Sequence, residues 1–225
     1  MFKITLRYKL AFFLFIVALF FSPSLFAHTI NYALEKKPPG FVISYYLGLG
    51  YKHIIPEGID HILFVGALCL LSTKIKTILW QATAFTVAHS VTLALSMKNI
   101  IAVPSAITEP VIALSICFVA IENILFSNLK AWRLLIVFIF GLIHGLGFAS
   151  ALNEIGLPPG KFYTSILAFN AGVELGQITI IVLLFASVIA WWGKKNWYRQ
   201  RVVYPLSGFI AMIAAYWTIE RLFFT

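Results

Sequence analysis

Charge is what this chain lacks most. Only 11% of its 225 residues are charged, less than half the share in an ordinary globular protein. Acidic groups are the scarcest, since Asp60 is the only aspartate and there are seven glutamates. With 61% hydrophobic residues, the chain has too few polar side chains to cover a soluble surface. The composition excludes a soluble enzyme and a disordered chain, and it predicts an integral membrane protein.

Paired cysteines are also absent. The chain has only Cys69 and Cys117, both within apolar runs, and no CxxC motif. This argues against a disulfide scaffold and a soft thiolate metal site, so we expect both residues to act as small hydrophobes.

The N-terminus has the pattern of a secretory signal peptide. Three basic residues precede an apolar run, 10–21, which is too short to cross a bilayer. A Ser-Pro-Ser breaker follows, and Ala27 is suited to the position before a cleavage site. We therefore expect 1–27 to be removed, with an uncleaved membrane anchor as the alternative.

The rest of the chain predicts an all-α, polytopic membrane helix bundle. Polar punctuation divides residues 57–225 into six apolar segments, each near the ~20 residues that a helix needs to cross a membrane. The six predicted transmembrane helices are 57–73, 77–97, 106–126, 134–152, 163–192 and 203–223.

Basic residues and tryptophans predict the orientation of these helices. With the N-terminus outside, the inner loops carry most of the loop lysines and arginines, and the outer loops carry only Lys98 and Lys161. The inner set is Lys74, Lys76, Lys130, Arg133, Lys194, Lys195, Arg199 and Arg201. Five of the six tryptophans fall at the same predicted inner boundary. We expect a protein of the bacterial inner membrane, with both termini of the mature chain outside.

Residues 28–56 are less regular and precede the first predicted span. The stretch 41–55 is apolar, but Gly48 and Gly50 interrupt it. We expect an extracytoplasmic loop followed by a helix lying on the outer surface, with a re-entrant segment as the alternative.

Polar side chains inside the spans indicate a structural or functional role, because inserting a charged group at the centre of a transmembrane helix costs about 2.5–3.5 kcal/mol. Asp60 and His61 lie side by side near the outer end of the first span, and His89 and His144 lie in the second and fourth. A polar stripe at helical spacing in the fifth span consists of Asn170, Glu174 and Gln177.

Helix counting places His89, His144, Asn170 and Glu174 between the midplane and the outer boundary, with Asp60 and His61 nearer the outer surface. Three histidines with an aspartate and a glutamate suit a divalent transition metal. The alternative is a hydrogen-bond network that only holds helices together, but such networks are usually built from Ser, Thr, Asn and Gln. Thr86 and Ser90 accompany His89 on its helix. The third span carries Glu109, Glu122 and Asn123 near its ends, as groups of a pathway or as solvated helix ends.

Several motifs, in order along the chain, resemble the HupE/UreJ family, in the branch with a histidine, a short spacer and Asp-His. They are GYKHIIPEGIDHILF (50–64), AFTVAHSVTL (84–93), Glu109-Pro110, AIEN (120–123), the segment 140–150 and FNAGVELGQ (169–177). This resemblance implies a nickel or cobalt permease linked to hydrogenase and urease maturation. It also implies that His53, Asp60 and His61 contact the metal, with His144 in a second motif.

Three hypotheses follow. In the leading one, a permease captures a divalent cation at Asp60 and His61, with His53, and passes it to His89, His144 and Glu174. Asn170 and Gln177 would orient these ligands. The second is a membrane-embedded zinc hydrolase with Glu174 as general base. The third is a structural membrane protein. We expect a metal ion and the lipid bilayer as partners and no nucleic acid, and the sequence predicts no oligomeric state.

Overall fold

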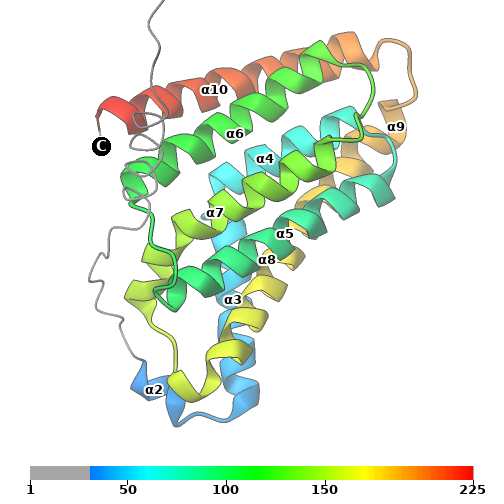
Figure 1. Ribbon diagram of the computed structural model, residues 1–225. Helices are drawn as coiled ribbons and strands as arrows, with labels where there is room; N and C mark the ends of the chain where they lie inside the picture. The colour runs from blue at the N-terminus through cyan, green and yellow to red at the C-terminus, as the bar shows by residue number, and fades with distance from the viewer. Residues whose placement is uncertain (1–30, 225) are drawn as a thin grey trace, which may run out of the picture.

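The computed structural model describes residues 31–224, and within that range the protein is a bundle of helices without strands (Figure 1). The helices are α2 (Tyr32–Glu35), α3 (Pro39–Ile54), α4 (Ile59–Leu71), α5 (Ile75–Met97), α6 (Ser105–Leu125), α7 (Arg133–Ile155), α8 (Phe162–Leu184), α9 (Ala190–Trp192) and α10 (Tyr204–Phe223). A 3₁₀ turn, Pro159–Lys161, precedes α8, and π-helical segments, Phe185–Ile189 and Arg199–Val203, follow α8 and precede α10. The predicted signal peptide lies outside the described residues.

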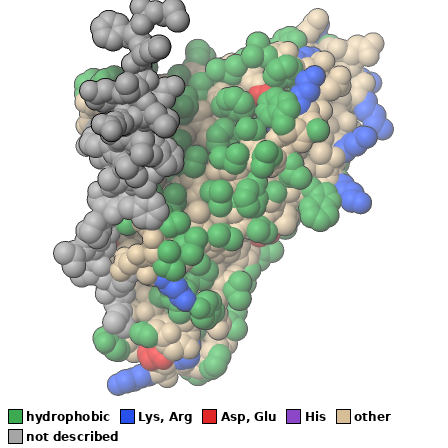
Figure 2. Space-filling view, in the orientation of Figure 1, with side chains coloured by type: hydrophobic (Ala, Val, Ile, Leu, Met, Phe, Trp, Pro, Cys, Tyr) green, Lys and Arg blue, Asp and Glu red, His purple; other side chains and the backbone are tan. Residues whose placement is uncertain are grey.

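Within residues 31–224, five helical segments are long and apolar enough to cross a membrane, and they coincide with the last five predicted spans. They are Ile75–Met97, Ser105–Leu125, Arg133–Ile155, Pro159–Trp192 and Arg199–Phe223. Their outward faces carry large exposed apolar side chains such as Leu167 and Met212. Figure 2 shows hydrophobic side chains spread over the face in view, with Lys and Arg gathered at the end where α9 lies. The expected all-α membrane bundle is therefore confirmed.

The first predicted span, 57–73, differs from the other five. Its helix, α4, has 13 residues and is about 20 Å long, which is shorter than the ~30 Å hydrocarbon core. α3 and α4 meet at a break of four residues, 55–58, and are bent by 69°. Together the two helices are long and apolar enough to count as one broken span, which would raise the number of candidate spans within the described residues from five to six.

α3 is buried against α8, in contrast to the surface helix expected for 41–55. Val42, Tyr46 and Ile54 are fully buried, and the Tyr46 hydroxyl donates a hydrogen bond to the Gly156 carbonyl (2.7 Å). A Cβ at Gly50 would overlap the backbone of Phe169, so the glycine that interrupts the apolar stretch permits close packing of α3 on α8. The break between α3 and α4 fits either a broken span or the re-entrant segment considered for 41–55.

α5 and α7 pack equally closely, side by side in Figure 1. A Cβ at Gly141 would meet the Phe85 carbonyl oxygen, and one at Gly145 would overlap the His89 carbonyl oxygen. The small residues of α7 thus hold it against the part of α5 that carries His89.

Candidate metal centre

Three histidines from three helices meet inside the bundle. His53 lies in the last turn of α3, His61 in the first turn of α4, and His89 in the C-terminal half of α5. One ring nitrogen from each lies within 4.8 Å of the other two. We call these three residues the histidine cluster. Ring nitrogens bind a divalent metal at about 2.0–2.1 Å, so a contraction of about an ångström or less would bring all three onto one ion.

The ring nitrogens of the cluster are available to a ligand. The Nε2 atoms of His53, His61 and His89 are buried, and none has a hydrogen-bond partner within residues 31–224. A buried polar atom without a partner is costly, and a bound cation would remove that cost. These atoms therefore fit a metal ion better than they fit a purely structural network.

The break between α3 and α4 brings two of the three histidines together. Gly58 lies in the break, and a Cβ there would overlap the carbonyl oxygen of His53. Only a residue without a side chain allows the chain to turn back so closely, which places His61 beside the end of α3. Their ring centroids are 4.7 Å apart.

We expect Gly58→Ala to weaken metal binding. Its methyl group would push α4 away from the His53 carbonyl and separate two ligands of the cluster. Changes in the surroundings of metal ligands typically lower affinity by about 10–100-fold, and we expect a loss in that range. Titration of the purified protein with Co²⁺ measures it. Gly48→Ala on α3 is the matched control, since a Cβ there has no atom within 4 Å, and equal affinities in the two variants would contradict the prediction.

Asn170 on α8 fixes which nitrogen of His89 faces the cluster. The Asn170 side-chain amide donates to the Ile166 carbonyl (2.8 Å), so its oxygen faces His89 Nδ1 at 3.1 Å. An amide oxygen only accepts, so Nδ1 must carry the proton. The lone pair is then on Nε2, which is the unpartnered atom. Asn170 therefore has the orienting position that the sequence analysis expected, next to His89.

His144 lies beside the cluster but is not one of its three members. Its ring centroid is 5.2 Å from that of His61, and it is buried. Ser115 Oγ donates to the Ile112 carbonyl (2.7 Å) and is 3.0 Å from His144 Nε2. The serine oxygen thus accepts a hydrogen bond from the Nε2–H group of His144, which leaves the lone pair of the ring on Nδ1. His144 therefore offers one more unpartnered ring nitrogen beside the histidine cluster.

The two acidic residues expected at the metal are held elsewhere. Both oxygens of Asp60 accept from Nη2 of Arg221, at 3.0 and 3.1 Å. Glu174 Oε1 accepts from Thr83 Oγ1 (2.7 Å), a contact that joins α8 to α5. Neither carboxylate belongs to the three-nitrogen group. The site is therefore built of imidazole, with a carboxylate next in sequence to His61.

The remaining expected residues have mixed surroundings. The hydroxyls of Thr86 and Ser90 donate to carbonyls of their own helix, one turn back. Gln177 is fully buried, and its side-chain amide has no partner within the described range. Glu109 lines the cavity described next, and its backbone carbonyl accepts a hydrogen bond from Arg221 (3.3 Å).

A cavity of about 320 Å³ leads to the site. It is lined by Asp60, His61, Glu109, Ile112, His144, Gly147, Phe148 and Arg221. A second cavity shares Asp60, His61 and Arg221 and is also lined by Glu57 and Trp217. Charged groups thus line the approach to His61 and His144 from the end of the bundle where α10 finishes.

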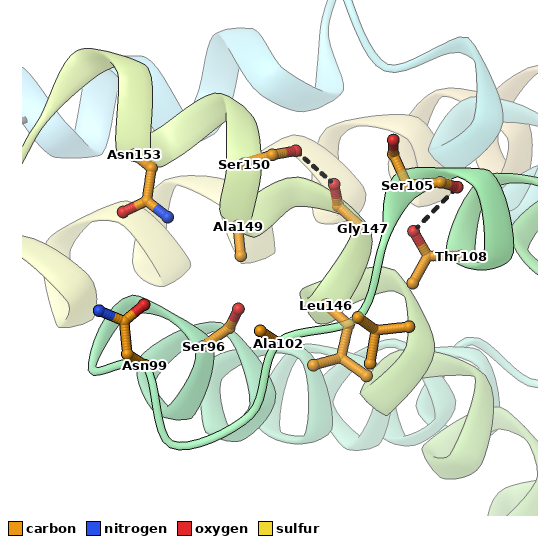
Figure 3. A pocket seen from close by; sticks show the side chains of 11 residues that line it. Ser96, Asn99, Ala102, Ser105, Thr108, Leu146, Gly147, Ala149, Ser150 and Asn153 are labelled. Carbon is orange, nitrogen blue, oxygen red and sulfur yellow. Dashed lines mark hydrogen bonds between the residues drawn. The ribbon is translucent and has the colours of Figure 1, made fainter. Parts of the chain in front are cut away.

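A third cavity lies at the α5–α6 connection and is lined without charged groups. Figure 3 shows Asn99 and Asn153 on opposite walls, with Ser96, Ser105, Thr108 and Ser150 contributing hydroxyls. Gly147 lines both this cavity and the one that reaches His144.

Aromatic side chains close the site on the other side. Phe64 and Phe85 are fully buried, with ring centroids 5.0 Å apart, and both contact the His144 ring. Phe140 stands edge-on to Phe64 at 6.2 Å. These phenylalanine side chains have no polar atom that could coordinate a cation. They separate the site from the α9 end of the bundle.

Beyond the aromatic layer lies a buried ion pair. Arg133 Nη1 donates to Glu122 Oε2 (2.7 Å), and both side chains are 2% exposed. Arg133 also donates to Gln81 on α5 (2.9 Å) and to Asn123 (3.2 Å). The Asn123 amide in turn reaches the Ala67 carbonyl of α4 at 2.8 Å. Glu122 and Asn123 are therefore members of a network that ties α4, α5, α6 and α7 together, and are not solvated helix ends.

Sequence reasoning missed three residues of this arrangement. Arg133 was counted only as a marker of orientation, and neither Ser115 nor Arg221 was singled out. Arg221 is one of only two charged residues in the predicted span 203–223, with Glu220. That position was a signal that it has a partner inside the bundle.

The fold and the site together define a polytopic membrane protein with a cluster of three histidines between its helices. The family model of the HupE / UreJ protein matches residues 28–221, which is most of the chain. The chain therefore belongs to the HupE/UreJ family, and this membership indicates a membrane protein related to metal transport. No curated protein and no solved structure matches it.

Proposed function

We propose that this protein carries a divalent transition-metal cation across the membrane and binds it at His53, His61 and His89. The observation that supports the proposal is the set of three buried ring nitrogens within 4.8 Å of one another, each on a histidine whose Nε2 has no partner in the described chain. Neutral imidazole is a ligand for nickel, cobalt and zinc and a poor one for magnesium or calcium. Nickel or cobalt is the cargo that the family resemblance favours.

The proposed route starts at the cavity lined by Asp60 and His61. The cation would lose water there, enter the histidine cluster, and have His144 as a neighbouring ligand. From that point Phe64 and Phe85 block the way toward the α9 end, and the Glu122–Arg133 network lies beyond them. Release at that end requires a rearrangement of the helices, which is the general scheme of alternating access.

We also propose the placement of the protein in the membrane. The basic α9 end would face the cytoplasm and the cavity with Asp60 the outside, following the distribution of lysine and arginine. The protein would then lie in a bacterial inner membrane, with both termini of the mature chain outside and the cation moving inward.

A membrane zinc hydrolase would use the same three imidazoles. It would also need a carboxylate next to the metal-bound water as general base. Glu174 Oε1 accepts a hydrogen bond from Thr83, both oxygens of Asp60 accept from Arg221, and neither carboxylate belongs to the three-nitrogen group. The geometry thus gives transport more support than hydrolysis.

Uptake into proteoliposomes tests the proposal. We expect vesicles with the protein to accumulate Co²⁺ or Ni²⁺, and vesicles with His89→Ala to match protein-free vesicles, because the substitution removes one of three ligands. Cys117→Ala is the control, as a buried thiol outside the site that should leave uptake unchanged. Uptake by a folded His89→Ala variant would contradict the site. Zinc retained one-to-one without any uptake would favour the hydrolase.

A further inference from the structure

Arg221 pairs with the carboxylate of Asp60, which lines both cavities that reach His61. Its Nη2 lies between the two oxygens of Asp60, at 3.0 and 3.1 Å, and the two side chains are 19% and 25% exposed. Arg221, Asp60 and His61 together line both cavities at this end of the bundle. An ion that approaches His61 through either cavity therefore passes this ion pair.

Two further contacts, one within α10 and one to α6, hold the guanidinium in place. It lies over the Trp217 ring of its own helix, 5.3 Å from the centroid, and its Nη1 donates to the Glu109 carbonyl of α6. These contacts keep a positive charge at the mouth of the cavity whether or not Asp60 is engaged. An arginine cannot lose this charge by deprotonation under ordinary conditions.

A cation that binds Asp60 must displace this arginine. Magnesium and calcium bind through carboxylate, carbonyl and water oxygens, and Asp60 is the one carboxylate adjacent to the cluster in sequence. Beyond it they would find only imidazole, which suits them poorly. A transition-metal ion gains the three imidazoles of the cluster in exchange for separating Asp60 from Arg221.

We propose that Arg221 is a selectivity residue for cation entry, whose guanidinium occupies Asp60 and keeps magnesium and calcium from binding there. This proposal rests on the proposed function and adds to it a mechanism that excludes the hard cations magnesium and calcium. The ion pair is partly exposed, so a cation that also gains imidazole ligands can exchange with the arginine. A hard cation has no such compensation.

The test is competition between Co²⁺ and Mg²⁺ on the purified full-length protein. We expect a large excess of Mg²⁺ to leave Co²⁺ binding to the unaltered protein unchanged. In Arg221→Gln, which keeps a hydrogen-bond donor without the charge, the same Mg²⁺ should weaken apparent Co²⁺ affinity about tenfold. Arg221→Lys retains the charge and should behave as the unaltered protein. Adding Asp60→Asn to Arg221→Gln should abolish the Mg²⁺ effect.

Arg221→Met is the second neutral variant, since its apolar stem still packs on Trp217. Folded Arg221→Gln and Arg221→Met proteins that remain insensitive to Mg²⁺ would overturn the proposal. So would failure of both to fold, because a group that a cation displaces in each cycle cannot be required for folding. If the unaltered protein binds no Co²⁺ at all, the proposed function fails. If it binds Co²⁺ and only the competition result is wrong, the function stands and the role of Arg221 falls.

Discussion

Replacing His61 with alanine is expected to lower the affinity of the purified protein for Co²⁺ by more than about 100-fold. Loss of an outer partner of a metal ligand already costs about 10–100-fold, and His61 is itself one of three ligands. It is also the member of the cluster that lines the cavities, so its loss affects both entry and binding. Titration followed by the visible absorption of Co²⁺ reports both the affinity and the presence of nitrogen ligands.

His144→Ala provides the comparison that makes this prediction specific. His144 is as buried as His61 and His89 but stands outside the three-nitrogen group. We expect His144→Ala to lower the affinity for Co²⁺ less than His61→Ala does. Asn170→Leu should lower this affinity about 10–100-fold, because it removes the group that fixes the tautomer of His89. An equal loss in the His61 and His144 variants would show a four-histidine site. An unchanged affinity in a folded His61→Ala protein would rule out the cluster as the binding site.

The sequence was sufficient for the parts of the fold that depend on composition. Long apolar segments must become helices in a bilayer, since every backbone group has to be satisfied internally. Five of the six predicted spans depend on nothing more. α3 was harder, because its glycines weaken the pattern of a spanning helix in sequence and permit close packing in three dimensions. Gly50 against Phe169 shows the second effect, which only the partner helix reveals.

The sequence pattern singled out His61, His89 and His144, whereas His53 was implied by the family resemblance. A histidine inside a membrane span is costly, so its position alone indicates that it has a partner. Whether a carboxylate can join these histidines depends on whether a basic side chain from elsewhere in the chain already pairs with it. Arg221 follows Asp60 by 161 positions in the chain, and no local spacing links the two. The same holds for Gln81 and Arg133, which contact each other across two helices.

The largest expected loss of stability follows from substituting Arg133 by methionine. The change leaves Glu122 buried, 2% exposed, without its positive partner. Breaking a buried ion pair from one side costs about 3–5 kcal/mol, because the remaining charge is uncompensated. We expect this decrease in the free energy of unfolding, measured by denaturant titration in detergent micelles. Lys76→Met, an exposed lysine at the same end of the bundle, is the control and should change little.

The double variant Glu122→Leu/Arg133→Met separates the charge from the packing. Removing both members of a buried pair is often neutral, so most of the lost stability should return. A double-mutant cycle then gives the coupling between the two residues. If Arg133→Met alone is as stable as the Lys76→Met control, the pair does not hold this end of the bundle closed. A merely structural pair would leave uptake intact once stability is restored. Recovered stability in the double variant together with lost or leaky Co²⁺ uptake would therefore show that the network beyond the aromatic layer closes the pathway as well as stabilising the bundle.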